Sequence, residues 1–148
     1  MNRNVDVFVT GIHVRDGEPT EKVESTNLGI YRHLEDGSHL VEYDENQDMG
    51  AGMKVHNRVQ IGADLRNMEI EREGSTNSHL SFGNNMVYDT EYSTPYGSMH
   101  MKVRTSSFDC SERGDSEIKV VAEYDLMIDD NLVSRSMIVI DIKNAETA

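Results

Sequence analysis

Apolar and polar residues alternate with a period of two along most of this chain, which is the pattern of half-buried β-strands. Residues 5–14 are rich in β-branched side chains, and the glycine and proline of residues 16–19 predict a turn after them. Residues 20–34 continue as a strand in which Gly29 indicates a bulge or a bend. The Asp-Gly pair within residues 35–38 then predicts a hairpin turn.

The middle of the chain repeats this pattern of short strands separated by turn residues. Strands are expected at residues 39–43, 53–61, 65–71, 79–82, 86–92 and 99–105. Residues 44–52 are polar and contain glycine, so they are expected to form a loop. No segment has the periodicity and the caps of a helix, and a helical turn is expected only within residues 44–53.

The last hairpin carries enough pairing information to predict its register. If Asp129-Asp130-Asn131 is a three-residue loop, the apolar pairs are Ile128 with Leu132, Ala122 with Ile138, Val120 with Ile140 and Ile118 with Ile142. The other face then pairs opposite charges, Lys119 with Asp141 and Asp125 with Arg135. A shift by one residue would break both sets. Because the loop lacks glycine, Asn131 or Asp130 is expected to adopt the left-handed conformation.

Strands spaced about every 8–12 residues with turns between them indicate a β-sandwich or a β-barrel. A barrel is favoured because closure removes the sheet edges that a sandwich leaves exposed. The expected fold is therefore all-β, a small closed antiparallel β-barrel of about 8–10 strands. The length of 148 residues indicates one domain, expected over residues 1–143, with residues 144–148 as a frayed tail.

The charge balance narrows the classes of partner. The chain has 14 basic and 27 acidic residues, a net charge of −13, and this field repels nucleic acid and anionic membranes. The expected partner is a small molecule, with no nucleic acid and no membrane, and a homodimer is left open. The single cysteine, Cys110, cannot form an internal disulfide, and no apolar run has the length of a membrane span. Because the N-terminal residues also lack the pattern of a signal peptide, a cytoplasmic location is expected.

Residues 92–99, Tyr-Ser-Thr-Pro-Tyr-Gly-Ser-Met, resemble the Tyr-x-Thr-Pro-Tyr-Gly signature of the YwiB-type bacterial proteins, a domain family of unknown function. Further segments that resemble this family are Gly11 with residues 16–18, residues 43–45, residues 49–50, the spacing of Arg72, Gly74 and Phe82-Gly83, residues 123–126 and residues 132–135. The resemblance implies a lipocalin-like (calycin-like) antiparallel barrel and no activity. The chain differs from the family in carrying Asp129-Asp130 where relatives tend to carry glycine, which concerns only the type of turn.

Residue patterns that could carry chemistry are few, and no metal site and no cofactor are predicted. None of the six histidines has a recognised metal-ligand spacing. In residues 99–101, Met-His-Met, a strand points both methionines to one face, so core methionines are expected rather than soft copper ligands. Residues 44–48 begin like a calcium loop, but Met49 and Val55 occupy the positions that require glycine and glutamate. Acidic neighbours raise the pKa of the Cys110 thiol, which argues against an activated nucleophile.

The most suggestive side chains form an aromatic and basic set. The candidate ligand-binding residues are Tyr88, Tyr92, Tyr96, His100, Arg104, Tyr124 and Arg135. Tyrosine and arginine that converge in the mouth of a barrel could hold a carboxylate or a planar ring. The alternative is that the tyrosines fill the barrel and Arg135 pairs with Asp125.

Three functions are compatible with these features. The leading hypothesis is a non-catalytic barrel that binds a small, partly apolar ligand, an expectation that rests on analogy at the level of fold. The alternatives are an interaction module whose acidic surface docks a basic partner, and an enzyme that uses His100 with a carboxylate at an unrecognised site. No catalytic motif is present, so no catalytic residue is assigned.

Overall fold

The computed structural model describes residues 2–46, 54–74, 77–94, 96–114 and 117–145. These residues form ten strands: β1 (Asn2–Val14), β2 (Glu21–His33), β3 (His39–Asn46), β4 (Lys54–Ile61), β5 (Asn67–Glu73), β6 (Ser78–Gly83), β7 (Val87–Thr94), β8 (Gly97–Arg113), β9 (Glu117–Ile128) and β10 (Asn131–Asn144). All strands join one antiparallel sheet in the order β6-β5-β4-β3-β2-β1-β10-β9-β8-β7. The region for which a helical turn was expected lies largely outside the described residues, and its described part, residues 44–46, belongs to β3.

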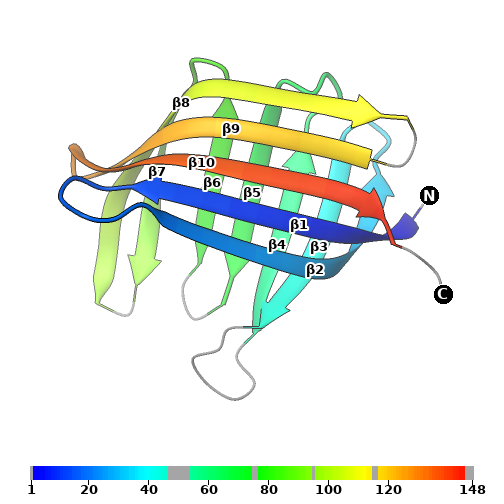
Figure 1. Cartoon of the computed structure of the whole chain (residues 1–148), viewed down its shortest axis with the longest axis horizontal. Coiled ribbons are helices and arrows are strands. Elements are labelled where there is room, and N and C mark those ends of the chain that lie inside the picture. The colour runs from blue at the N-terminus through cyan, green and yellow to red at the C-terminus, as the bar shows by residue number, and fades with distance from the viewer. Residues whose placement is uncertain (1, 47–53, 75–76, 95, 115–116, 146–148) are drawn as a thin grey trace.

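The sheet curls into two layers whose strands cross (Figure 1). Strands β1, β2, β9, β10 and most of β8 run across the front, and strands β3 to β7 cross behind them. Two long strands connect the layers. β2 pairs with β3 only over residues 29–33, and β8 pairs with β7 over residues 97–104 before it continues beside β9.

Different local features of the backbone allow β8 and β2 to pass from one layer to the other. In β8 the pairing with β9 shifts register between Thr105 and Ser107, and such a bulge bends a strand. In β2 the sequence led us to expect a bulge or a bend at Gly29, but the pairing with β1 and β3 runs through Gly29 without a register shift. The glycine is needed for close approach, since a Cβ atom there would lie 2.8 Å from the carbonyl oxygen of Glu42.

The two ends of the sheet, β6 and β7, are joined by the turn between them and not by a hydrogen-bonded ladder. Thr105 of β8 donates its N–H to the carbonyl of Met86, and its hydroxyl accepts the N–H of Gly83. The side-chain amide of Asn84 both donates to the carbonyl and accepts the N–H of Phe108. The result is a nearly closed barrel, which confirms the all-β antiparallel barrel expected from the sequence.

The core fills the space between the two layers, as the alternation in the sequence predicts. Side chains with essentially no exposure come from both layers, and the largest of them are Phe82, Ile61, Met68 and Ile140. In β8, Met101 and Val103 are buried while His100 is exposed, so the methionine-histidine alternation follows the expected pattern. The barrel is therefore filled by side chains over most of its length.

The register of the last hairpin is confirmed from residue 134 onward and differs at the turn. Ile138 pairs with Ala122, Ile140 with Val120, Ile142 with Ile118, Asp141 with Lys119 and Arg135 with Asp125. Ile128, however, pairs with Asn131 and not with Leu132, because the loop contains only Asp129 and Asp130. Both aspartates have positive φ angles, 50° and 66°, as a tight hairpin turn requires. A register shift between Leu132 and Ser134 then restores the expected pairing.

No helix in the described part of the chain has the length and the apolar character needed to cross a membrane.

We expect Gly29→Ala to lower the free energy of unfolding by about 1–3 kcal/mol, because the added methyl group meets backbone of β3 that cannot move aside. Gly11→Ala is the matched control, since its Cβ would meet only the end of the His13 ring at 3.2 Å. Urea unfolding of the two variants checks this. Equal stabilities would show that close approach is not the reason for glycine at position 29.

Candidate functional site

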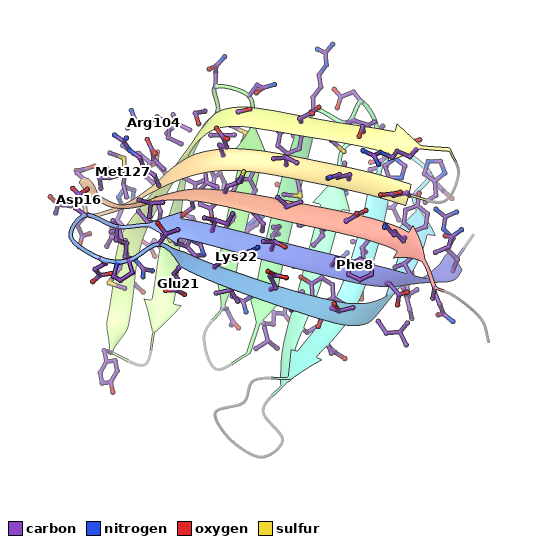
Figure 2. The ribbon with its side chains drawn as sticks, in the orientation of Figure 1. Phe8, Asp16, Glu21, Lys22, Arg104 and Met127 are labelled. Carbon is purple, nitrogen blue, oxygen red and sulfur yellow. The ribbon has the colours of Figure 1, made fainter. Side chains whose placement is uncertain are left out.

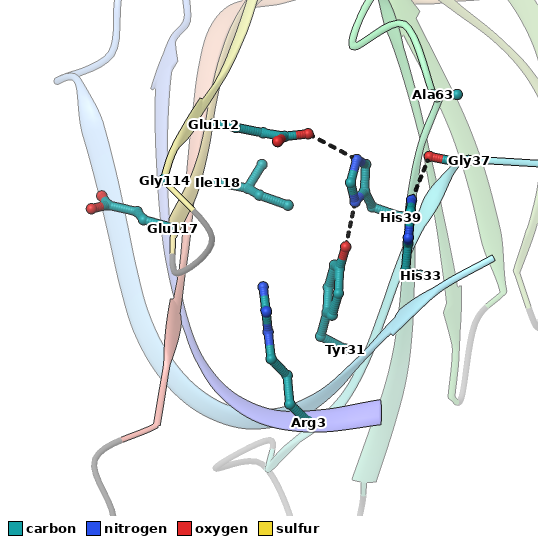
Figure 3. A pocket seen from close by; sticks show the side chains of 10 residues that line it. All are labelled: Arg3, Tyr31, His33, Gly37, His39, Ala63, Glu112, Gly114, Glu117 and Ile118. Carbon is teal, nitrogen blue, oxygen red and sulfur yellow. Dashed lines mark hydrogen bonds and ion pairs between the residues drawn. The ribbon is translucent and has the colours of Figure 1, made fainter. Parts of the chain in front are cut away.

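A cavity of about 560 Å³ opens at one end of the barrel. Five side chains that define it are Arg3 from β1, Tyr31 and His33 from β2, His39 from β3 and Glu112 from β8 (Figure 3). Glu117 and Ile118 of β9 and the turns at Gly37, Ala63 and Gly114 complete the lining. The cavity therefore lies where the front layer and the back layer meet at their ends.

Strand pairing places these side chains beside one another. Arg3 lies directly opposite Tyr31 across β1 and β2, and its Cζ atom is 4.4 Å from the centroid of the tyrosine ring. His33 lies opposite His39 across β2 and β3, and their rings stack with centroids 5.2 Å apart. Glu112 lies opposite Ile118 across β8 and β9. The site is thus built from cross-strand neighbours on one face of the sheet.

The turn between β2 and β3 fixes the position of His39. Gly37 takes a φ of 90°, which favours glycine, and its N–H donates to the carbonyl of Leu34. The carboxylate of Asp36 accepts the N–H of Ser38 at 2.9 Å and also its hydroxyl. The Asp-Gly pair that predicted the hairpin therefore also starts β3 at the register that turns His39 into the cavity.

Tyr31, His39 and Glu112 form a continuous chain of hydrogen bonds. The tyrosine hydroxyl is 2.5 Å from His39 Nδ1, and His39 Nε2 is 3.1 Å from Glu112 Oε1 (Figure 3). A carboxylate only accepts, so Nε2 carries a proton; in the neutral ring Nδ1 then accepts the tyrosine O–H. The nearby His33 Nε2 donates to the carbonyl of Gly37 at 3.2 Å. Each polar atom of the His39 ring therefore has a defined role.

Arg3 is the cation of the cavity and has an unused donor. Its Nε is buried and has no hydrogen-bond partner among the described residues. The guanidinium stacks on the Tyr31 ring and points into the cavity (Figure 3). A buried donor without an acceptor costs free energy unless another molecule supplies one. Glu117 does not fill this role, because its carboxylate points away from the cavity (Figure 3).

Burial and neighbouring charges shift two pKa values in the site. Burial lowers the pKa of His39, the positive charge of Arg3 and proximity to His33 act in the same direction, and Glu112 opposes them. Burial raises the pKa of Tyr31, Glu112 adds to this rise, and Arg3 opposes it. Both groups are therefore held in their neutral forms near pH 7.

Two of the seven candidate residues from the sequence lie inside the barrel. Tyr124 is buried, and its ring packs edge-on against Phe82 with centroids 5.0 Å apart. A 3.2 Å hydrogen bond joins the Tyr88 hydroxyl to His79 Nδ1 and so connects β7 to β6. Neither residue lines the end cavity.

The other candidates lie elsewhere, and the structure brings only part of the set together. Tyr124 and Arg135 line one small pocket of about 280 Å³, and Arg104 and Arg135 both lie opposite Asp125. His100 is 3.2 Å from Asp89, and Arg104 is 3.7 Å from Asp125. Both His100 and Arg104 are on the outer face of β8, where Figure 2 labels Arg104. Arg135 of β10 is exposed and lies opposite Asp125 of β9. Tyr96 is fully exposed in the turn between β7 and β8. Tyr92 belongs to β7, and its side chain lies outside the described part of the structure.

Sequence reasoning did not select the residues of the cavity. The alternation of Val5, Val7 and Val9 extends back to Arg3, which places a charged residue at a core-facing position. Glu112 likewise follows Phe108 and Cys110 on the inner face of β8. A charge at a core-facing position near the end of a strand was the signal that could have found the site.

Other reactive side chains are less suited to catalysis or to metal binding. Burial raises the pKa of Cys110 to about 11, and Glu112 and Asp109 add to the rise, so the thiol is a poor nucleophile at neutral pH. Within the described residues, no three His, Cys, Asp or Glu side chains are grouped so that they could hold a metal ion.

The fold and the cavity define a small antiparallel β-barrel with a polar pocket at one end. Residues 7–140 match the family described as "Domain of unknown function (DUF1934)", and the chain belongs to this family. The crystal structure of the ywiB protein from Bacillus subtilis is similar, with a TM-score of 0.81, 17% sequence identity and coverage of 98% of this chain and 94% of that chain. This likeness concerns the fold, and together with the family match it confirms the family expected from residues 92–99 and the further similar segments. No curated protein matches the chain.

We expect the free energy of unfolding of the wild-type protein to fall between about pH 7.5 and 5.5 more steeply than that of His39→Gln. The folded state lowers the pKa of His39, so below the unfolded-state pKa of about 6.5 the unfolded chain binds a proton that the folded chain resists. The extra slope is at most about 1.4 kcal/mol per pH unit.

Urea unfolding across this pH range measures the difference. The effect of His56 on the pH dependence of stability has the opposite sign, because its hydrogen bond to Asp44 at 2.7 Å raises the pKa of His56. Its contribution is present at low pH and is lost as the pH rises, and it is the same in both proteins. Parallel pH profiles would contradict a buried neutral His39.

Proposed function

We propose that this protein binds a small molecule with an anionic group in the end cavity, and that Arg3 is the anchor for that group. The observation that carries the proposal is the position of Arg3, which lines a cavity of about 560 Å³ and whose buried Nε has no acceptor among the described residues. A carboxylate or phosphate supplies the acceptor geometry that a guanidinium prefers. The stacking of Arg3 on Tyr31 holds the guanidinium in one orientation, so little side-chain entropy is lost on binding.

The hydrogen-bond chain makes this binding depend on pH. With neutral His39, the Tyr31 O–H is used by His39 Nδ1, and the tyrosine presents only a lone pair to the cavity. When His39 gains a proton, Nδ1 becomes a donor, and Tyr31 can direct its O–H toward a bound anion. Anion binding therefore favours proton uptake by His39, and affinity rises as the pH falls.

The remaining lining supports a ligand that is not purely ionic. The ring of Tyr31 and the side chain of Ile118 give the cavity an apolar wall beside Arg3. The net charge of −13 repels a highly charged anion at long range, whereas a single acidic group on a partly apolar body meets less repulsion. A small acid with an apolar or planar body fits these constraints best.

We expect Arg3→Gln to abolish ligand retention while the protein stays folded. Native mass spectrometry of protein purified from its natural host, compared with the denatured mass, detects a retained ligand. The wild-type protein should carry an adduct that Arg3→Gln lacks, because the variant removes the charge that binds the anion.

Arg104→Gln is the matched control, since Arg104 is an exposed arginine of the outer face that was a candidate from the sequence. It should retain the adduct. Retention of the adduct in Arg3→Gln would refute Arg3 as the anchor, and its loss in Arg104→Gln would show that the effect is not specific to the cavity. A wild-type protein without adduct that also fails to bind small carboxylates or phosphate in solution would refute the proposed function.

Acid–base catalysis on the bound molecule is the second candidate, and the Tyr31–His39–Glu112 chain favours it. The three groups are arranged as proton donor, base and orienting carboxylate. We expect Tyr31→Phe to keep the adduct and to lose any turnover found by substrate screening of the folded wild-type protein. Turnover that survives in Tyr31→Phe would exclude this chain as the catalyst.

A further inference from the structure

The first part of β2 is an open sheet edge. Residues 21–28 pair with β1 on one side, and β3 joins β2 only from Gly29 onward. No other strand among the described residues pairs with this segment. Its pairing with β1 has no register shift, and it contains no proline. The segment therefore lacks the bulges and prolines by which proteins commonly protect an edge.

The side chains of this edge are exposed on both faces of the sheet. Val23, on the inner face, is 52% exposed because the barrel is open at this position. Lys22, which Figure 2 labels, and Glu24 lie together on the outer face, and their charged groups are 3.0 Å apart. Nothing in the described part of the protein covers these three residues, so the edge can receive another strand.

We propose that two copies of this chain pair through this edge, antiparallel and centred on Val23, so that their sheets become continuous. A two-fold axis at Val23 places Lys22 opposite Glu24 of the partner subunit, and Glu24 opposite Lys22 of the partner subunit. Both charge pairs lie on the outer face, and the two valines meet on the inner face. The edge Lys22-Val23-Glu24 is thus complementary to itself.

Charge selects this register over its neighbours. Centring the pairing on Glu24 would place two glutamates directly opposite each other, which is unfavourable. Centring it on Ser25 would place Lys22 opposite Leu28 of the partner subunit and would form no directly opposed ion pair. Only the register centred on Val23 opposes unlike charges on both sides of the axis.

The net charge of −13 on each copy works against association, but its range is short at physiological salt. The Debye length there is about 8 Å, so contacts at the edge outweigh charges on distant parts of the barrel. This inference uses residues on the far part of β2 from the end cavity, and it does not depend on what the cavity binds.

Charge reversal tests the pairing by sedimentation equilibrium. The wild-type protein should be a dimer, and Lys22→Glu or Glu24→Lys should each raise the dissociation constant about tenfold, because both intersubunit pairs become repulsive. The double variant Lys22→Glu/Glu24→Lys restores unlike pairs and should dimerise like the wild type. Lys102→Glu, an outer-face lysine away from this edge, is the control and should leave the dimer unchanged.

Ser25→Lys tests the register itself. Within each chain Glu21 is 3.3 Å from Arg15. In the proposed dimer, residue 25 lies opposite Glu21 of the partner subunit, so the new lysine places a second cation beside each Glu21 carboxylate and should tighten the dimer. In the register centred on Ser25, the same change would bring two lysines together and weaken it. A monomeric wild type, a dimer that ignores both single reversals, or a dimer weakened by Ser25→Lys would overturn the proposal; circular dichroism shows that each variant is folded.

Discussion

The attachment of the β6–β7 turn to β8 is the contact on which the barrel depends. A sheet of ten strands has two ends, and here the ends meet because Thr105 and Phe108 bond to Met86, Gly83 and Asn84. The bulge in β8 lies at the same place, so the strand bends where it receives the turn. Closure at this seam gives every strand an inner and an outer face. Because of that closure, residues that alternate along a strand face the core and the outside of the barrel in turn.

The unequal lengths of the strands explain why the barrel has different ends. β2 has 13 residues, but β3 pairs only with its last five. Where β2 and β3 pair, Tyr31, His33 and His39 are brought under the end of the front layer and meet Arg3 and Glu112. Before that point β2 has no partner on one side and remains an edge. One strand therefore supplies both the polar cavity and the open edge, at opposite ends.

Local patterns predicted most of the fold. The alternation and the Gly, Pro and Asp-Gly signals located the strands, and opposed charges fixed the last hairpin, where Arg135 lies opposite Asp125 as expected. The turn itself was predicted one residue too long, because two successive aspartates with positive φ are uncommon and a glycine-free loop suggested a longer one. The compensating register shift after Leu132 has no local signal. Residue preferences therefore predict the type of this turn less well than they predict the strands beside it.

The candidate site depends on closure of the barrel, and no single segment of the sequence predicts that closure. Tyr88, His100 and Arg104 are close in sequence, but β7 and β8 alternate, so the tyrosine lies inside and the other two lie outside. Arg3 and Glu112 come from strands far apart in the chain, and only the sheet order brings them to one opening. What sequence does show is a charged residue at a core-facing position. Such a residue needs a partner, an opening to water or a ligand. Arg3 lines the end cavity, and its buried Nε has no acceptor among the described residues.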